Sequence, residues 1–386
     1  MAKSRGSSAR FAHIRLENWR NFVQADVSLP RRVFLVGPNA SGKSNLLDAF
    51  RFLRDIVAVG GGLQQAVRAR GGVSSLRCLG ARQHSDLRIR VRIANEGHSC
   101  SWEYDLCFNQ DSHRRPVVSL ERVRRDEETL LERPDAADRQ DPERLTQTFL
   151  EQVNANQAFR KVADFFSSVC YLHIVPQLVR EPDRSAGRTN DPFGADFLEQ
   201  IARTAERTQR ARLRRVEEAL RVAVPQLQNL ELWRDTRGAP HLRGKYAHWR
   251  PQGAWQTEER FSDGTLRLIG LLWAVQDGTG PLLLEEPELS LHPGVIRYLP
   301  QMFARLQHRS GRQVIISTHS TEMLRDEGIG LDEALLLIPE AESTSVRPAS
   351  DYQEVVALVQ GGSSLADVIM PRTEPPLARQ LVLFGG

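Results

Sequence analysis

Apolar residues along the chain repeat with two different periods, and each change of period predicts where strands and helices lie. Residues Phe11–Leu16 and Val23–Leu29 alternate with period two, so they predict a hairpin with its turn in the polar run between them. Val33–Val36 is a short continuous apolar run of the kind found in buried strands. Between Leu46 and Leu53 the apolar residues repeat at helical spacing, so a helix is expected soon after that strand.

The middle of the chain changes from strand-like to helical patterns. Further strands are predicted at Leu87–Ala94, Ser101–Phe108 and Val117–Val123. Residues 124–148 are highly charged with scattered prolines, which favours an excursion from the core or a mobile loop. From 147 to 224 the pattern is mostly helical, with a strand near Tyr171–Gln177 and a polar loop at Glu181–Phe193.

After Leu230 strand-like patterns return, and helices then alternate with strands, which predicts a parallel sheet covered by helices. The expected elements are a helix at Thr265–Val275, a strand at Leu282–Leu284, a helix at Val295–Leu306, strands at Val314–Ser317 and Ala334–Ile338, and a last helix at Tyr352–Gln360. Together with the N-terminal hairpins, this order predicts an α/β fold with a mixed sheet, covering helices and an inserted, mainly helical subdomain.

Composition narrows the class of protein. The chain has 386 residues, of which 40% are hydrophobic and 26% charged, and its net charge is only +4. The longest apolar runs are far shorter than the roughly 20 residues of a membrane span, and the polar start does not resemble a secretory signal. The four cysteines fit neither a disulfide framework nor zinc-ligand spacing, which favours a reducing compartment. We therefore expect a cytoplasmic protein with no membrane partner.

A phosphate-binding pattern follows the strand Val33–Val36. Residues 37–44 match G-x-x-x-x-G-K-[ST] between a predicted strand and a predicted helix, which is the context that this motif requires. Its backbone N–H groups converge on phosphate oxygens, Lys43 reaches the β- and γ-phosphates, and the Ser44 hydroxyl ligates Mg²⁺. The structural alternative is a glycine-rich turn before a helix. The expected ATP-binding residues are Gly37, Pro38, Asn39, Ala40, Ser41, Gly42, Lys43, Ser44 and Asn45.

The predicted strand Leu282–Leu284 runs into two carboxylates. Groups at the carboxyl end of a buried strand are where an α/β sheet handles its ligands. Glu285 is therefore expected in the Mg²⁺ shell, and Glu286 is expected to orient and polarise the attacking water. Taken alone, the run is equally typical of a strand that ends in an acidic turn.

Two further polar positions lie beside buried elements. His319 follows the strand Val314–Ser317, where it can donate to the γ-phosphate or hold the water, although a lone histidine there is more often structural. Ser262 suits the N-cap of the next helix, and Gly264 leaves the first-turn N–H groups open to an anion. An ordinary capped core helix is the alternative for that segment.

The order of these motifs resembles that of ABC-type ATPases of the RecF and SMC group. More narrowly, the chain resembles bacterial predicted ATPases of the AAA-domain type allied to the overcoming-lysogenization-defect family. In that family a serine–glycine signature replaces the transporter form, and Ser262, Asp263 and Gly264 match it residue by residue. The resemblance covers about residues 10–60 and 255–345. It implies a P-loop NTPase fold of the ABC-ATPase type.

The resemblance also suggests how the chain is divided. The expected segments are a flexible arm (1–10), the N-terminal part of the ATPase core with the phosphate loop and a β-rich lobe (11–123), a charged loop and mainly helical insertion (124–230), the C-terminal part of the core with signature, acids and His319 (231–345), and a tail (346–386). Fewer than 50 residues follow Leu337, so the family's nuclease domain and its activity are not expected within this chain.

The chain departs from the family pattern at two places. Glu285 stands where the first acid is usually Asp, and the glutamine that links the metal to the lobe corresponds to either Gln83 or Gln177. Residues 288–293 match the common E-x-x-L-H-P form of the family's dimer-contacting loop.

The resemblance implies a head-to-tail dimer with two ATP molecules between the subunits. Lys43 of one subunit would face Ser262 of the other, so that the signature acts in trans. The negatively charged γ-phosphate would bind the start of the signature helix of the second subunit, and hydrolysis removes this phosphate. We therefore expect a slow ATPase that uses Mg²⁺ and switches between closed and open dimers.

A basic stripe in the insertion is a candidate DNA-binding surface. With 197–224 taken as one helix, five arginines fall on one side, and they could follow DNA phosphates. The alternative is a solvated face in an arginine-rich protein, partly neutralised by neighbouring glutamates. The stripe consists of Arg203, Arg207, Arg210, Arg214 and Arg221.

We consider three alternative functions for this protein. The first is an ATP-switched, DNA-associated ATPase in repair or in antiviral defence. The second is a regulatory scaffold ATPase that holds and releases a separate effector, such as a nuclease or toxin, without binding DNA. The third is a transporter motor subunit, which the form of the signature and the internal insertion argue against.

Overall fold

The chain folds into two units, each built from segments that lie far apart in the sequence. In a computed structural model, the described residues are 9–82, 85–94, 101–181, 191, 193–247, 254–374 and 380. The first unit takes its residues from Met1–Val169, Thr279–Leu283 and Pro300–Gly386, and the second from Cys170–Gly278 and Leu284–Leu299.

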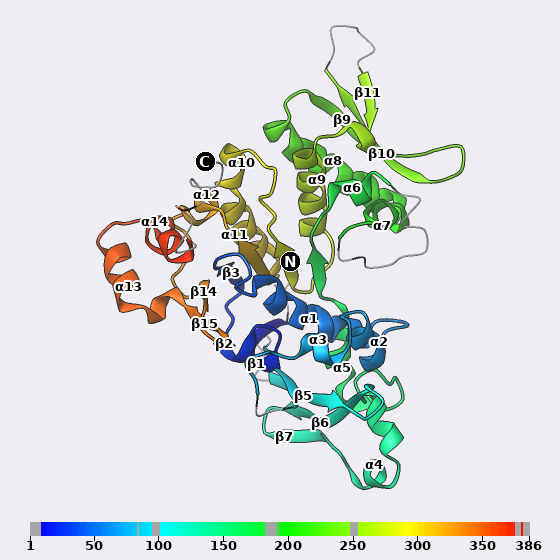
Figure 1. Ribbon diagram of the computed structural model, residues 1–386. Coiled ribbons are helices and arrows are strands. Elements are labelled where there is room, and N and C mark those ends of the chain that lie inside the picture. Colours follow the sequence, from blue (N-terminus) through cyan, green and yellow to red (C-terminus); the bar gives the residue numbers. More distant parts are fainter. Residues whose placement is uncertain are drawn as a thin grey trace, which may run out of the picture. The chain divides into compact units, whose positions relative to one another are not determined.

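An antiparallel sheet forms one part of the first unit (Figure 1). Its strands lie in the order β2-β1-β4-β5-β6-β7. Alternate residues of β4 are buried, as expected for a sheet with one face on the core. The strands are β1 (Arg10–Trp19), β2 (Phe22–Ser28), β4 (Leu87–Ala94), β5 (Ser101–Gln110), β6 (Pro116–Arg125) and β7 (Glu128–Arg133).

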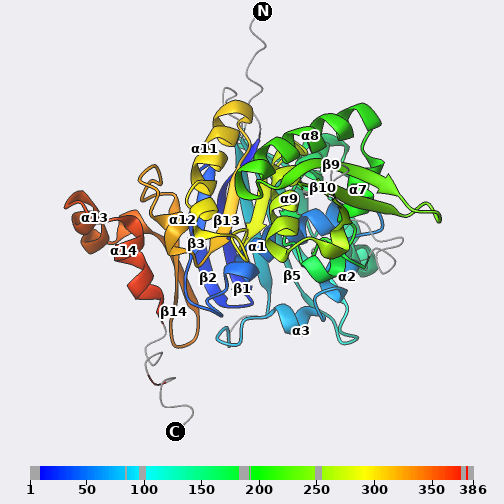
Figure 2. The same cartoon turned by 90° about the horizontal axis from the view of Figure 1, so that it is seen from above.

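A mixed sheet forms the other part of the first unit. Within this unit its order is β15, β14, β3, β13 and the first residues of β12. Strand β3 is parallel to β13 and β14, whereas β14 and β15 are antiparallel, and β3 and β13 run side by side in Figure 2. The strands are β3 (Arg32–Val36), β12 (Leu282–Glu285), β13 (Val314–Thr318), β14 (Ala334–Pro339) and β15 (Thr344–Pro348).

Aromatic packing fixes the first helix of this unit against its strands. The ring of Phe11 on β1 lies 4.7 Å from that of Phe50 on α1 and 4.8 Å from that of Phe165 on α5. All three rings are buried. The helices are α1 (Lys43–Val57), α2 (Leu63–Arg68), α3 (Val73–Leu76), α4 (Ala136–Gln140), α5 (Arg160–Ser167), α11 (Leu299–Ser310), α12 (Thr321–Leu324), α13 (Gln353–Gln360) and α14 (Leu365–Ile369).

The second unit combines helices with a three-stranded antiparallel sheet in the order β11-β10-β9 (Figure 1). Helix α8 contacts both β9 and α9. Its strands are β8 (Cys170–Leu172), β9 (Leu227–Arg234), β10 (Pro240–Tyr246) and β11 (Ala254–Thr257). Its helices are α6 (Pro176–Val179), α7 (Phe197–Arg203), α8 (Glu206–Ala223), α9 (Asp263–Gln276) and α10 (Pro293–Ile296).

The charged stretch 124–148 is ordered, contrary to the expected mobile loop. It contains the end of β6, strand β7 and helix α4. The reason is a buried ion cluster: the guanidinium of Arg133, which is 1% exposed, pairs with Glu121 and Asp138 at 3.2 and 2.9 Å. The charges that suggested a solvated loop are therefore part of the interior.

The helix predicted at Val295–Leu306 is two helices, α10 and α11. Pro300 lies at the second position of α11. A proline in mid-helix clashes with the carbonyl four residues earlier, whereas a proline in the first turn of a new helix is well tolerated. The strand predicted near Tyr171–Gln177 is likewise shorter, because β8 ends at Leu172 and the chain then forms α6.

Some predictions fall on parts of the chain outside the described residues. These include most of the expected arm 1–10, Gln83, most of the polar loop Glu181–Phe193 and the end of the tail. Among the residues that the structure describes, every helix is too short or too polar to cross a bilayer.

Candidate functional site

The phosphate loop connects β3 to α1 in the middle of the mixed sheet, as predicted. Gly42 adopts a left-handed conformation with φ of 95°, which glycine reaches without strain. A Cβ on Gly37 would lie only 2.5 Å from the carbonyl oxygen of Leu337. Both glycines are therefore required by the local backbone.

The interior of the loop carries groups suited to phosphate. Lys43 is 5% exposed and its Nζ donates to the carbonyl oxygens of Gly37 and Pro38, both at 2.9 Å. The hydroxyl of Ser41 is completely buried and has no hydrogen-bond partner among the described residues. A buried hydroxyl without a hydrogen-bond partner costs free energy, and the loop lies at the N-terminus of a 15-residue helix, which favours an anion. This arrangement therefore fits the triphosphate of a nucleotide.

Residues at the turn between β1 and β2 form hydrogen bonds with the phosphate loop. Asn21 donates from Nδ2 to the carbonyl oxygen of Ala40 at 3.1 Å and accepts from Nδ2 of Asn45. The indole of Trp19 donates to the carbonyl oxygen of Asn45 at 3.0 Å. The alternation of apolar residues predicts only a turn here. Polar and aromatic residues next to a phosphate loop are the signal in the sequence that points to this further role.

A buried ion pair anchors α1, the helix that the phosphate loop begins. Arg70 holds both carboxylate oxygens of Asp48 at 2.9 Å. Burial alone raises the pKa of Asp48, but Arg70, with Arg51 and Arg20, outweighs that effect and holds the pKa below its usual value. The helix is therefore fixed by charge as well as by its apolar face.

His319 is brought to the phosphate loop by strand register. Thr318, the last residue of β13, pairs with Val36, the last residue of β3, in parallel register. His319 therefore follows its strand at the same level as Gly37 follows β3. Ser320 then caps α12 by accepting from the N–H of Met323 at 3.2 Å.

The two predicted acids lie in the second unit, at and just after the end of β12. The Tyr171 hydroxyl donates to the carboxylate of Glu285, and Nδ1 of His173 lies 3.3 Å from the Glu285 carbonyl oxygen. Glu286 has φ of 43°, a left-handed conformation that is uncommon outside glycine and costs about 1 kcal/mol. Such local strain is typical of functional positions.

The signature segment starts α9 in the same unit. Ser262 is its exposed N-cap and accepts from the N–H of Thr265 at 3.2 Å, as predicted. A Cβ on Gly264 would lie 2.4 Å from the carbonyl oxygen of Ser290. The helix start therefore packs directly on the loop that follows the two acids.

Two arginines that the sequence analysis did not single out surround the signature. Arg180 donates from Nη2 to the carboxylate of Asp263 at 2.6 Å and to the carbonyl oxygen of Phe261 at 2.7 Å. Burial lowers the pKa of Arg267, against the charges of Asp263 and Glu286, which raise it. In an arginine-rich chain nothing distinguished these two from the others, because their role depends on tertiary contacts.

The arginine stripe does not lie on one continuous helix, so the expectation of a single helix over 197–224 was wrong. The segment forms α7 and α8, with an extended break at Thr204 and Ala205. Within α8, three stripe arginines form ion pairs with a glutamate one turn away. These pairs are Arg210 with Glu206, Arg214 with Glu218, and Arg221 with Glu217. The break and the pairing together favour the solvated-face alternative.

Neither candidate for the metal-linking glutamine is shown to reach the acids. Gln83 lies outside the described residues. Gln177 is exposed on α6. The side chains that do contact Glu285 in the described part of the second unit include Tyr171 and His173.

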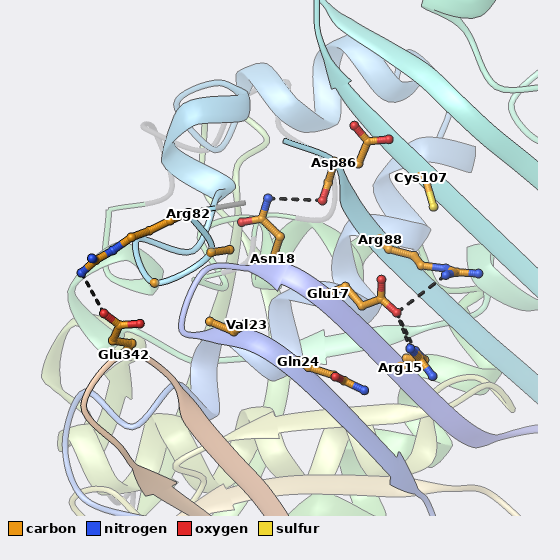
Figure 3. A pocket seen from close by; sticks show the side chains of 12 residues that line it. Arg15, Glu17, Asn18, Val23, Gln24, Arg82, Asp86, Arg88, Cys107 and Glu342 are labelled. Carbon is orange, nitrogen blue, oxygen red and sulfur yellow. Dashed lines mark hydrogen bonds and ion pairs between the residues drawn. The ribbon is translucent and has the colours of Figure 1, made fainter. Parts of the chain in front are cut away.

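A cavity of about 760 Å³ lies in the first unit beside the β1–β2 turn (Figure 3). Its charged groups pair with one another. Arg82 pairs with Glu342 at 2.7 Å, and Glu17 accepts from Arg15 at 2.6 Å and lies 3.6 Å from Arg88. The residues that line the cavity include none of the predicted site residues.

The motifs thus fall into two sets. The first unit holds the phosphate loop and His319, whereas Glu285, Glu286 and the signature residues belong to the second.

The family model described as "AAA domain, putative AbiEii toxin, Type IV TA system" matches residues 32–325. The chain belongs to this family. Two RecF proteins, described as DNA replication and repair proteins, are 35% identical to it over 83 residues, in Clavibacter michiganensis subsp. michiganensis (strain NCPPB 382) and Clavibacter sepedonicus. Each match covers 21% of this chain and 20% of the relative. The chain thus spans about a fifth of those relatives' length.

Solved structures of SMC heads share the fold. The SmcHead bound to the C-winged helix domain of ScpA has a TM-score of 0.56 and 13% identity, and the match covers 87% of this chain and 97% of that one. The Smc head domain of Pyrococcus furiosus, bound to the C-terminal domain of ScpA, has a TM-score of 0.51 and 11% identity over 92% and 100%. The predicted fold, that of an ABC-type, RecF/SMC-like ATPase, is confirmed.

Proposed function

We propose that this protein hydrolyses ATP slowly with Mg²⁺ and closes as a head-to-tail dimer around the nucleotide, as a switch in a DNA-associated process. The observation that carries the proposal is the phosphate loop that precedes the long helix α1. Lys43 is buried in this loop, and so is the hydroxyl of Ser41, which has no hydrogen-bond partner among the described residues.

In this mechanism the residues of the phosphate loop, Gly37 to Asn45, bind the triphosphate. Lys43 exchanges its two carbonyl partners for β- and γ-phosphate oxygens, and the Ser41 hydroxyl gains a partner. Glu286 holds the attacking water and accepts its proton, and His319 orients the water or donates to the γ-phosphate.

We propose Ser44 and Glu285 as the Mg²⁺ ligands, because hydroxyl and carboxylate oxygens suit this ion. Ser44 is an exposed residue of the first unit, and the carboxylate of Glu285, in the second unit, accepts a hydrogen bond from Tyr171. Among the described residues there is no cluster of three or more acidic, histidine or cysteine side chains for a metal, and Mg²⁺ is commonly held by one or two protein oxygens together with phosphates and water. When bound, the ion neutralises charge on the phosphate oxygens.

Dimerisation rests on the signature helix. Ser262 is exposed at the start of the 14-residue helix α9, so its first-turn N–H groups and Asp263–Gly264 backbone can meet a phosphate presented by a second copy. The loss of the γ-phosphate then removes the charge that holds the two copies together.

The Glu286→Gln variant tests this mechanism. Because it retains the shape of the side chain but removes the base, it should bind ATP, hydrolyse it at least about 100-fold more slowly and accumulate as a dimer. Sedimentation velocity with saturating ATP and Mg²⁺ measures the dimer, and Glu354→Gln, an exposed glutamate on α13, is the matched control. A monomer under these conditions, in both the parent protein and the variant, would refute the dimer.

DNA association is supported by the RecF relatives, which are described as DNA replication and repair proteins. The second candidate, a regulatory scaffold that holds and releases a separate effector without binding DNA, is supported by the SMC heads, whose structures contain a bound ScpA domain. Stimulation of hydrolysis by DNA favours the first candidate. Co-purification of a partner that is released on ATP hydrolysis, with no DNA effect, favours the second.

A further inference from the structure

One face of the three-stranded sheet in the second unit carries two partly exposed tryptophans. Trp233 on β9 is 37% exposed and Trp255 on β11 is 43% exposed, on the sheet labelled β9, β10 and β11 in Figure 1. The opposite face of the sheet is apolar, and Leu230 and Leu242 are buried there. Strand β9 contacts α8, and strand β10 contacts α7. The sheet therefore has a core side and an outer side, and large aromatic rings lie on the outer side.

Cations connect the two rings across β10. The guanidinium of Arg243 lies 4.8 Å from the ring centre of Trp255 and 5.8 Å from that of Trp233. The ring of His241 lies 5.6 Å from that of Trp233. Lys245 pairs in register with Trp255, so His241, Arg243 and Lys245 point to the same side of β10. We call these five residues the tryptophan face.

Charges of both signs lie at this face. Arg243 pairs in register with Glu231, and Nδ1 of His241 lies 2.6 Å from the carboxylate of Glu258, which is completely buried. Glu231 accepts from Arg243 at 2.5 Å, but the Arg243 side chain remains 37% exposed. Asp235 is engaged by the backbone N–H groups of Arg237 and Ala239 in its own turn. Glu258 is buried and Glu231 is bonded to Arg243, so Lys245 and the exposed part of Arg243 supply the positive charge that the face presents to solvent.

Exposed aromatic rings separated by cations suit one class of ligand in particular. Single-stranded nucleic acid offers unpaired bases, which stack on aromatic side chains, and phosphates, which bind cations. Duplex DNA keeps its bases stacked within the helix and cannot use the rings. A protein partner would favour a desolvated apolar centre, whereas here charged side chains lie between the rings.

We propose that the tryptophan face binds single-stranded nucleic acid, with bases stacked on Trp233 and Trp255 and phosphates held by Arg243 and Lys245. The inference deepens the DNA-associated role proposed above, because it names the surface and the strand form. It also moves nucleic-acid binding away from the arginine stripe of α7 and α8.

The test is fluorescence anisotropy with a labelled deoxythymidine 20-mer and the full-length protein without nucleotide. Replacing either tryptophan by alanine should weaken binding about 5- to 150-fold, the range measured for loss of one stacked base. The conservative Trp→Phe replacements keep a stacking ring, so they should retain most of the affinity. A thermal unfolding midpoint of the alanine variants close to that of the parent shows that their loss of binding does not arise from unfolding.

Arg125→Ala is the matched control for charge. Arg125 lies in the first unit and is likewise ion-paired, to Glu128, and placed 5.9 Å from a tryptophan ring. Its removal should leave the affinity unchanged, whereas Arg243→Ala should weaken it and reduce its salt dependence.

Three results would overturn the inference: no binding of the 20-mer, equal competition by a duplex of the same length, or Trp→Ala variants that bind as the parent does. The ATP-dependent dimer is measured separately by sedimentation, so failure of this inference and failure of the proposed switch give different results.

Discussion

At the scale of single residues, the most informative contact is the one between Tyr171 and Glu285. The tyrosine hydroxyl donates to the carboxylate that we assign to the Mg²⁺ shell. Partners of metal ligands orient the ligand and affect metal affinity nearly as much as the ligands themselves. Tyr171 is therefore a positioning residue of the proposed reaction, and the sequence contained no motif that pointed to it.

We predict that Tyr171→Phe raises the Mg²⁺ concentration needed for half-maximal ATP hydrolysis by about 10-fold and leaves the maximal rate at high Mg²⁺ largely intact. The measurement is a Mg²⁺ titration of phosphate release. Tyr298→Phe, at a tyrosine that is 61% exposed in the same unit, should behave as the parent protein. An unchanged titration curve for Tyr171→Phe would contradict the assignment.

A second prediction concerns Gly264, whose Cβ position lies 2.4 Å from the carbonyl oxygen of Ser290. In an ordinary helix, alanine is favoured over glycine by about 1 kcal/mol. Here we expect Gly264→Ala to destabilise the protein by about 1–3 kcal/mol and to slow hydrolysis, because the start of α9 must move away from the loop that follows the acids.

Thermal unfolding and steady-state hydrolysis check this prediction. Gly361→Ala is the comparison, since its nearest neighbours lie at 3.3 Å and its backbone is not left-handed. If Gly264→Ala proved more stable than the parent, the close contact would not exist as described.

At the scale of elements, buried ion pairs stabilise more of the helices and strands than the pattern of apolar residues indicated. Helix α1 is fixed by the apolar face that the sequence predicted, but also by the buried pair of Asp48 and Arg70. Strand β7 and helix α4 are ordered by the buried cluster around Arg133. Conversely, three arginines of α8 that suggested a DNA-binding stripe form ion pairs with glutamates of the same helix.

The Asp48–Arg70 pair gives a prediction about pH. The pKa of Asp48 is lower in the folded protein than in the unfolded chain, so the pair stabilises fully above the unfolded pKa of about 4. That contribution is lost as the pH falls through the folded pKa. Asp48→Asn should lower the free energy of unfolding at pH 7 by about 3 kcal/mol, because it leaves a buried arginine without its charge partner.

Urea unfolding between pH 7 and pH 3 checks this expectation. The difference in stability between the parent and Asp48→Asn should shrink below about pH 4. A difference that stayed constant over the whole range would show that the pair's charge does not contribute. Asp367→Asn, at an exposed N-terminal position of α14, is the control and should cost about 1 kcal/mol or less.

At the scale of the whole molecule, nucleotide binding should stabilise the fold. A ligand that binds only the native state at 100 times its Kd stabilises by about 2.7 kcal/mol. We therefore expect ATP with Mg²⁺ to raise the melting temperature of the parent protein, and Lys43→Ala to abolish the shift. Differential scanning fluorimetry measures both. A shift that survived in Lys43→Ala would place the nucleotide elsewhere.

Elements whose signals are local could be predicted from the amino-acid sequence. The strand–loop–helix of residues 32–57, the capped helix after Ser262 and the acid-ended strand β12 all lie where their patterns predict. Glycines at 37 and 42 belong to the same group, because a phosphate loop needs them whatever surrounds it. These features depend on neighbours within a few residues, so a linear pattern is enough to predict them.

Which charged and aromatic side chains lie together becomes apparent only in the folded protein. Tyr171 and Glu285, Arg180 and Asp263, and the tryptophans of β9 and β11 are separated in the sequence by tens of residues. Their roles depend on register and packing. A charged residue reads the same in the sequence whether it is buried beside its partner or exposed to solvent. The free energy of the charged group in these two environments differs by several kcal/mol. That difference exists only once the chain has folded.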